Sequence, residues 1–395
     1  MLKDPEKLSA CQEIFESSPI NITTEGKRHL GAAIGSLNHR NDYIDNMVVK
    51  WQKNIESLSK IANSQPHAAY AAFIHAEQHK YTYFLRTIPG ISENLKTLDE
   101  TINNVFIPAL FGCELSDNDR DILSLPIREG GLGIKKVSEN ADVSYNASRK
   151  ITLPLITQIT KQSSCLPAAE DVVKARIDTI KQIKDLEAHK IEDIKKAQDE
   201  VTQRALEQLS QPGASSWLGA IPLESQGFNL NKGEFQDALA LRYNKPVKNL
   251  PAKCPCDAAF TTTHAMDCHR GGFVNARHDN IRNLECVLLK SVVQDVEVEP
   301  KLQPVVNRAG YRKTAILDDD GHPDIRARGF WRNGQNAFFD IRVTNADAIS
   351  QQNSSIKSIL QKHEAEKKRA YNRRIMEVEH GSFTPLVFTT TGDEP

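Results

Sequence analysis

The chain has 395 residues, 39% of them hydrophobic, and a formal net charge of −1 at pH 7. This length allows two or three domains with ordinary cores, and the near-zero charge excludes nucleic-acid binding through a global basic field. No stretch approaches roughly eighteen uninterrupted apolar residues, and the first residues are too charged for a signal peptide. We therefore expect an intracellular protein that does not associate with membranes.

Residues 1–150 are predicted to be mainly helical, with breaks at short proline and glycine motifs. Three strings are unusual for generic helix: EGKRHLG at 25–31, QPHAAY at 65–70, and LP at 125–126 followed by GGLG at 130–133. Glycine tolerates positive φ angles, so we expect the GGLG cluster to form a backbone turn.

Residues 151–250 are predicted to form a helical connector. Residues 168–209 are charged, with apolar residues at steps of three to four, which predicts one long helix or two. The heptad breaks around residues 188–190, so packing on the same protein is favoured over a coiled coil. Residues 211–216 resemble a linker, and residues 217–243 a small helical module without assigned chemistry.

Three of the seven cysteines lie within fifteen residues and, with one histidine, give the spacing C-x-C-x7-H-x3-C. Zn²⁺ prefers thiolate and imidazole ligands, and four protein ligands saturate a structural site. We predict a structural zinc knuckle at 251–270, held by Cys254, Cys256, His264 and Cys268. The simpler alternative is a chance grouping of two buried cysteines and a surface histidine.

Arg277 and His278 precede a helix expected over residues 279–292. Helix N-termini favour anions, so this pair could meet a phosphate, or it could form an ordinary surface cap. A short alternating strand is expected at residues 296–299.

The stretch 322–342 carries Asp324 after a proline, two strand-like runs around Asn333-Gly334, and then Asp340 and Arg342. Two carboxylates on neighbouring strands can hold Mg²⁺ if they share a face of the sheet. A two-residue turn would put Asp324 and Asp340 on opposite faces, so this interpretation requires an odd-length loop or a bulge. We expect a three-residue loop, with Asp324 opposite Thr344. The alternative is an exposed hairpin with two solvated carboxylates.

A helix is expected from about residue 354 to 378, followed by an edge strand at 383–390. Lys367 and Tyr371 fall on its apolar side, and a lysine there is uncommon unless it pairs with a carboxylate. The basic run formed by Lys367, Lys368 and Arg369 is typical of a solvated face, a phosphate-tracking surface or a nuclear-import signal.

The N-terminal strings, in this order, resemble the region after the catalytic palm in reverse transcriptases of retrotransposons. Such polymerases carry paired aspartates in a YxDD or FADD string, which this sequence lacks. The resemblance therefore implies that residues 1–150 are a thumb-like remnant without polymerase activity.

The CCHC cluster, the Arg-His pair, the Pro-Asp, the second aspartate and the Lys-x-x-x-Tyr resemble the restriction-like endonuclease of non-LTR retrotransposons, a member of the PD-(D/E)XK superfamily. The resemblance implies an α/β domain at 271–395, with a mixed sheet flanked by helices, that nicks target DNA. It implies DNA and the element's RNA as partners, a nuclear location, and structural Zn beside catalytic Mg or Mn. It also implies the following roles: Asp324 and Asp340 as metal ligands, Lys367 as the catalytic lysine, Tyr371 as its neighbour, and Arg277 and His278 as DNA contacts. The basic run on the helix adds Lys368 and Arg369 as candidate nucleic-acid contacts.

Arg342 stands where the superfamily pattern expects lysine. Arginine keeps the positive charge but does not act as a base, so Lys367 would have to supply the amine from the helix. The competing interpretation is a catalytically decayed, zinc-stapled nucleic-acid-binding protein. The discriminating feature is whether the Lys367 amine comes within about 5 Å of the two carboxylates. A helical interaction protein built on residues 168–209 is a third alternative, which leaves the CCHC cluster and the aspartates unexplained.

Overall fold

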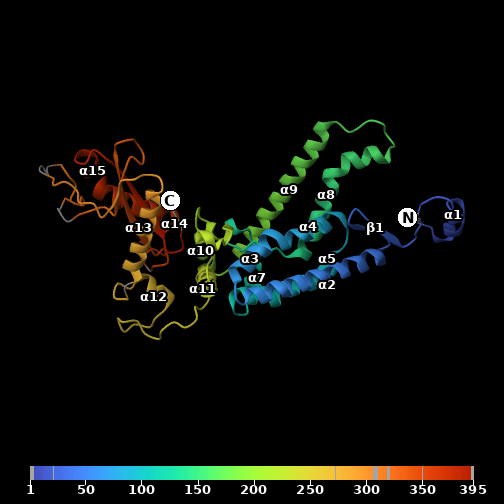
Figure 1. Cartoon of the computed structure of the whole chain (residues 1–395), viewed down its shortest axis with the longest axis horizontal. Helices are drawn as coiled ribbons and strands as arrows, with labels where there is room; N and C mark the ends of the chain where they lie inside the picture. Colours follow the sequence, from blue (N-terminus) through green and yellow to red (C-terminus); the bar gives the residue numbers. More distant parts are fainter. Residues whose placement is uncertain are drawn as a thin grey trace. The chain divides into compact units, whose positions relative to one another are not determined.

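The computed structural model describes residues 4–20, 22–271, 273–305, 310–317, 321–348 and 350–392. The chain divides into two units (Figure 1). Unit 1 comprises Met1–Gln203 and Leu218–Ala240, and unit 2 comprises Arg204–Trp217 and Leu241–Pro395. Residues 151–250 are thus divided between the units.

Unit 1 is mostly helical. Its helices and strands, in chain order, are α1 (Leu8–Ile14), β1 (Gly26–His29), β2 (Ala32–Gly35), α2 (Leu37–Ala62), α3 (Pro66–Ala72), α4 (Gln78–Thr87), α5 (Ser92–Thr101), α6 (Ile107–Phe111), α7 (Asp117–Ser124), α8 (Val137–Thr160) and α9 (Ala169–Lys196). Two π-helical turns, Phe73–Glu77 and Ile102–Phe106, join α3 to α4 and α5 to α6. The expected helix over 168–209 is two helices, α9 and α10 (Glu200–Leu209), and the unit boundary falls within α10.

The core of unit 1 follows from helical spacing. Helix α2 begins after Ser36, whose side chain accepts a hydrogen bond from the N–H of His39. Ile44, Val48 and Ile55 lie four and then seven residues apart, about one and two helical turns, so they are buried on the same face of the helix. Residues 25–31, singled out above as unusual for generic helix, belong to the antiparallel β1–β2 hairpin. The hairpin itself was not predicted, because short charged strands carry little periodicity.

The glycine cluster forms the expected turn. Gly130 and Gly133 have φ angles of 93° and 70°, which confirms the prediction of positive φ. At Gly131 a Cβ atom would lie 2.0 Å from the carbonyl oxygen of Leu125, so only glycine fits this approach. The hydroxyl of Tyr70 donates to the carbonyl of Leu132 at 2.9 Å and fixes the turn against α3.

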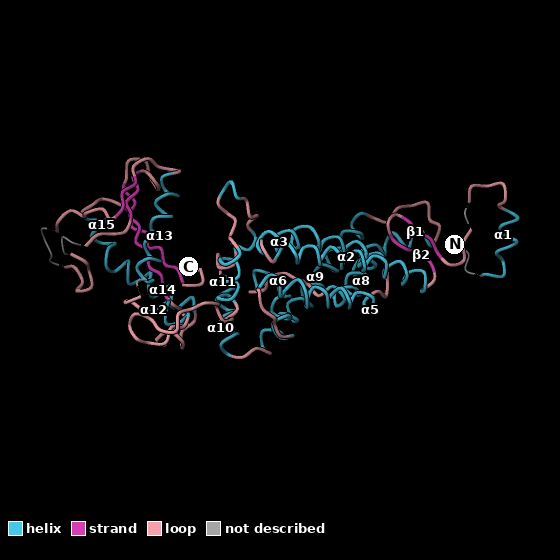
Figure 2. Tube along the Cα trace, turned by 60° about the horizontal axis from the view of Figure 1, so that its bottom comes forward, coloured by secondary structure: helices cyan, strands magenta, loops and turns pink. Residues whose placement is uncertain are grey.

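Unit 2 contains a small mixed sheet and its covering helices. Its helices and strands are α12 (Thr262–Asp267), α13 (Phe273–Lys290), β3 (Val296–Val298), β4 (Ile325–Arg328), β5 (Asn336–Thr344), α14 (Ile356–Lys367), α15 (Arg373–Glu377) and β6 (Ser382–Thr389). Helix α11 (Lys232–Arg242) begins in unit 1 and ends in unit 2. Figure 2 shows the strands of this sheet beside α13 and α14.

The four strands are ordered β3-β4-β5-β6, with β5 and β6 parallel and the other pairs antiparallel. Alternate residues of β5 face opposite sides. Phe339 and Ile341 pack with Leu289 of α13, whereas Phe338 packs with Tyr371 and Ile375 of the α14–α15 segment. Residues 241–395 therefore contain an α/β region with helices on both faces of a mixed sheet, as expected for the C-terminal part of the chain.

Several expected boundaries shift. Helix α13 begins at Phe273, six residues before the expected start, so Arg277 and His278 lie inside the helix and not at its N-terminus. The helix expected over 354–378 is interrupted by a π-helical turn, Lys368–Asn372. The last strand is the edge strand β6, as Pro385 indicated.

Candidate active site and metal centre

Asp324 and Asp340 face each other across the β4–β5 pair. Ile325 pairs with Phe339 and Arg328 with Asn336, so continuing the register by one residue places Asp324 opposite Asp340. The connection is the odd-length loop of residues 329–335, which satisfies the parity requirement. The expected three-residue loop and the pairing with Thr344 were wrong: Arg328 pairs with Asn336, and the N–H of Gly329 donates to the carbonyl of Gln335 at 2.8 Å in the same register, so pairing ends before residues 330–334.

Asp340 is buried and contacts a lysine. Its side chain is 4% exposed, and one carboxylate oxygen, Oδ2, forms an ion pair with Nζ of Lys367 at the end of α14. The same oxygen has no well-aligned hydrogen-bond donor among the described residues. Burial raises the pKa of Asp340 to about 6, against the opposing charge of Lys367. A buried carboxylate held this way retains an oxygen suited to a cation.

Asp324 is held by two donors. The N–H of Ile341 donates to Oδ2 at 2.5 Å, and Nε2 of His278 lies 3.3 Å from Oδ1. Burial acts to raise the pKa of Asp324, but the His278 and Ile341 hydrogen bonds and the charge of Lys367 together lower it. The hydrogen bond to Asp324 raises the pKa of His278 in turn. Asp324 is therefore ionised at neutral pH and fixed in orientation.

Tyr371 and Arg342 lie at the margin of this group. The Tyr371 hydroxyl donates to the carbonyl of His322 at 3.2 Å, two residues before Asp324, and burial raises its pKa. Arg342 is directed to Glu366, with Nη1 and Oε2 3.8 Å apart, and Glu366 also contacts Nδ1 of His363 at 3.1 Å. Tyr371 thus supports the backbone ahead of Asp324, while Arg342 is half-exposed beside helix α14.

The four residues expected to contact nucleic acid have different surroundings. Arg277 donates to the carbonyl of Met266 at 3.4 Å and lies 3.3 Å from its sulfur. Lys368 is paired with Glu364, and Arg369 is exposed. His278 is engaged with Asp324, as described above. The helix N-terminus argument for Arg277 and His278 is wrong, since both residues lie in the second turn of α13.

The aspartate pair fits a hard divalent cation. It offers carboxylate oxygens from two adjacent strands, and Asp340 Oδ2 lacks a well-aligned donor within the described residues. Mg²⁺ is typically bound by one or two carboxylates together with waters and phosphate oxygens, so two aspartates match its needs. Lys367 beside Asp340 supplies a positive charge at the same place.

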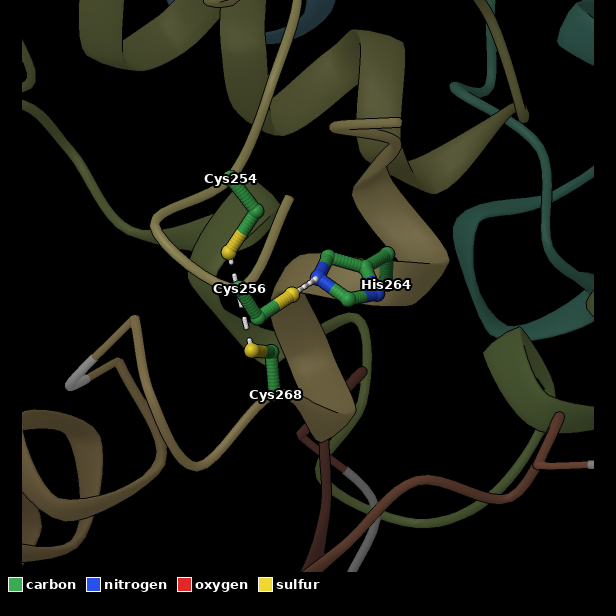
Figure 3. Close-up of side chains that lie close together, drawn as sticks. All are labelled: Cys254, Cys256, His264 and Cys268. Atoms are coloured by element: carbon green, nitrogen blue, oxygen red, sulfur yellow. Dashed lines mark hydrogen bonds between the residues drawn. The ribbon is translucent and has the colours of Figure 1, made fainter. Parts of the chain in front are cut away.

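A second cluster, from a different part of unit 2, could hold a metal such as zinc. The ligand atoms of Cys254, Cys256, His264 and Cys268 all lie within 4.8 Å of one another. Figure 3 shows the four side chains converging, with Cys254 Sγ 3.5 Å from Cys268 Sγ and Cys256 Sγ 3.2 Å from His264 Nε2. Zn–S bonds of about 2.3 Å in a tetrahedral site require sulfur atoms about 3.8 Å apart, close to this arrangement.

Local structure arranges these ligands. Cys254 and Cys256 flank a turn in which the N–H of Asp257, at a φ angle of 68°, donates to the carbonyl of Cys254 at 2.9 Å. His264 lies on α12, whose N-cap Thr261 accepts a hydrogen bond from the His264 N–H at 3.1 Å. The N–H of Gly271 lowers the pKa of Cys268 to about 7 despite opposing burial, which favours the thiolate that metals bind.

A side-chain hydrogen bond connects the segment of the cysteine cluster to the end of strand β5. Asn345, which follows β5, donates from Nδ2 to Oδ2 of Asp267 at 2.9 Å. Asp267 precedes Cys268 directly, and Asn345 follows the strand that carries Asp340. Neither this contact nor that between His278 and Asp324 could be predicted from sequence patterns, because each joins segments distant in the chain.

No protein-family model matches this chain, and a search of curated proteins also finds no match. Among the described residues, no helix is long and apolar enough to cross a membrane.

Proposed function

We propose that unit 2 is a Mg²⁺- or Mn²⁺-dependent DNA endonuclease with a restriction-like active site, in a chain related to non-LTR retrotransposon proteins. The observation that carries the proposal is the convergence of Asp324, Asp340 and Lys367 on one face of a mixed sheet. The lysine amine contacts one carboxylate directly and interacts electrostatically with the other. Together these residues supply the donor set and positive charge that hydrolysis of a phosphodiester requires.

Asp324 and Asp340 would hold the cation, which lowers the pKa of a bound water and neutralises phosphate charge when present. Asp324 is oriented for this task by the Ile341 N–H and His278. Lys367 would stabilise the negative charge that develops on the phosphate. Arg342 would serve only as a phosphate contact, because a guanidinium is not deprotonated in proteins.

In this proposal the cysteine cluster is a closed structural zinc site that holds the N-terminal side of the domain. DNA would be the substrate, element RNA a further partner, and the nucleus the place of action. Unit 1 would be the thumb-like remnant of a reverse transcriptase without polymerase activity. This part of the proposal rests on the resemblance of the short strings in residues 1–150.

The decisive experiment is nicking of supercoiled plasmid by the purified full chain with Mg²⁺ or Mn²⁺. We expect wild-type protein to nick, Asp340→Ala and Lys367→Ala to be inactive, and zinc content to be unchanged in both. Glu297→Gln removes an exposed carboxylate from the same sheet and should retain activity. Absence of nicking by wild-type protein, with DNA binding and zinc retained, would instead support the decayed nucleic-acid-binding protein, the alternative that Arg342 favours.

A further inference from the structure

The hairpin loop, residues 329–335, joins the strands that carry the two aspartates and presents an exposed tryptophan. Trp331 is 59% exposed. Burial of a large aromatic side chain is strongly favourable, and exposed tryptophan is concentrated at contact surfaces. We therefore ask which ligand would cover this ring when it binds.

Trp331 is held in place by contacts between its loop and the sheet. Phe330 packs edge-on against Trp331, with ring centroids 4.8 Å apart, and against Phe339 of β5, with centroids 5.4 Å apart. The N–H of Gln335 donates to the carbonyl of Arg332 at 3.1 Å, and its side chain donates to the carbonyl of His380 at 3.2 Å. The loop is thus a tied structure that holds the indole outward.

The charges around the indole identify the class of ligand. Arg328 and Arg332 are both exposed, and no ion pair joins either to a carboxylate of the described residues. The nearby carboxylate of Asp295 is already occupied by Arg326 at 3.0 Å. Arg328 precedes Trp331 by three residues, and Arg332 follows it directly. Exposed aromatic and cationic side chains on one hairpin are suited to nucleobases and their phosphates, because the ring stacks and the cations neutralise the backbone.

We propose that Trp331 stacks on an unpaired base of the DNA substrate, with Arg328 and Arg332 on the adjacent phosphates. This inference rests on the proposed nuclease function. Asp324 and Arg328 are four residues apart on an extended strand, about 13 Å at ~3.3 Å per residue. DNA rises about 3.4 Å per base pair, so Arg328 lies about four base pairs from the cleaved bond when the hairpin runs along the duplex, and Trp331, in the loop beyond it, stacks on a base at least about four base pairs away.

The test uses full-length chain carrying Asp340→Ala, without divalent metal, and measures DNA affinity by fluorescence anisotropy. One duplex is fully paired, and others carry a short mismatch at stepped distances from the nick mapped with wild-type protein. The chain that keeps Trp331 should bind most tightly to a duplex with the mismatch at least about four base pairs from the nick, and Trp331→Ala should lose that preference, a loss of about tenfold in affinity. Trp331→Phe should retain most of it. Arg332→Ala should weaken binding to all duplexes and reduce the salt dependence by about one phosphate contact.

The outcomes separate the two proposals. Unchanged affinity of Trp331→Ala for every duplex, with wild-type nicking intact, overturns the stacking proposal alone. Failure of the parent chain to bind any duplex overturns the proposed function together with it. Loss of self-association in Trp331→Ala by sedimentation velocity, without an effect on DNA affinity, identifies a protein contact and also overturns the stacking proposal.

Discussion

The amine of Lys367 contacts the carboxylate of Asp340 across two elements far apart in the chain, the end of helix α14 and the middle of strand β5. Asp340 is buried, and burial keeps its pKa near 6 even with the lysine present. The ion pair therefore leaves part of the desolvation of Asp340 uncompensated. The protonation of Asp340 should therefore affect the free energy of unfolding, which can be measured independently of activity.

Asp340→Asn should gain stability relative to the wild-type chain as pH rises. The carboxyl binds its proton more tightly in the folded state, with a pKa of about 6 against 3.8, so its contribution to stability is lost as pH rises through this window. The unfolding free energy of the variant, relative to that of the wild type, should increase by up to about 3 kcal/mol between pH 4 and pH 8. Chemical denaturation of the metal-free chain at both pH values measures it, and a pH-independent difference would contradict it.

Divalent metal affinity should fall as the medium becomes acidic. A protonated Asp340 cannot ligate a cation, so the Mn²⁺ affinity of the wild-type chain should decrease about tenfold for each pH unit below about 6. Isothermal titration calorimetry with Mn²⁺ tests this. Asp340→Ala is the control and should show no such binding at this site at any pH.

His278→Ala should weaken metal binding more than DNA binding. His278 holds Oδ1 of Asp324. Loss of a hydrogen bond to a metal-binding carboxylate typically lowers metal affinity or activity about 10- to 100-fold, and we expect an effect of this size here. The expected result is a higher Mg²⁺ concentration for half-maximal nicking, partly rescued by His278→Gln. A decrease in metal-free DNA affinity with an unchanged Mg²⁺ dependence would show instead that His278 is a DNA contact.

Cys256→Ser should release the metal of the cysteine cluster and leave the aspartate site chemically intact. Its Sγ lies 3.2 Å from His264 Nε2, and a hydroxyl is a much poorer zinc ligand than a thiolate. Elemental analysis should give one zinc per wild-type chain and close to none in the variant. Cys286→Ser alters a buried cysteine outside the cluster and should keep its zinc; equal zinc in all three chains would refute the assignment.

Gly131→Ala should destabilise unit 1, because the added Cβ would lie 2.0 Å from the Leu125 carbonyl oxygen. Overpacking of this severity typically costs at least about 2 kcal/mol. Gly219→Ala is the matched control, since a Cβ there meets nothing within 4 Å. Thermal unfolding of both variants distinguishes a steric effect from loss of glycine flexibility, and equal melting temperatures would exclude the steric account.

The positions of Asp340 and Lys367 could be anticipated from the sequence because strand parity and helix periodicity are local properties. Asp340 and Lys367 each lie on the side of their element that these periods predict. The loop length between β4 and β5 was not predictable from Asn333-Gly334, since the turn depends on how Phe330 packs on the sheet. The residue pairs His278–Asp324 and Asn345–Asp267 depend on tertiary packing and leave no periodic signal.

The start of helix α13 was misplaced, and the β1–β2 hairpin was not predicted, for related reasons. Phe273 is exposed, so it adds nothing to the apolar stripe from which a helix start is inferred. In the hairpin, Gly26 and Gly35 face each other so closely that a Cβ on Gly35 would lie 2.5 Å from the Gly26 Cα. Such close backbone approach is a property of the paired strands, invisible in either string alone.

The π-helical turn at Lys368–Asn372 makes the length of this segment more important than its composition. Such a turn holds one residue more than an α-helical turn, and the N–H of Ile316 donates to the carbonyl of Ala370 within it at 3.1 Å. Deleting Arg369 would remove this extra residue, so the segment would close as a regular α-helical turn. Tyr371 would then keep its phase toward the His322 carbonyl, and buried Arg374 its phase toward the carbonyl of Gln303. A residue inserted into α14 would instead rotate everything downstream by about 100°. This segment should therefore accept a substitution or a deletion at Arg369 better than an insertion in α14.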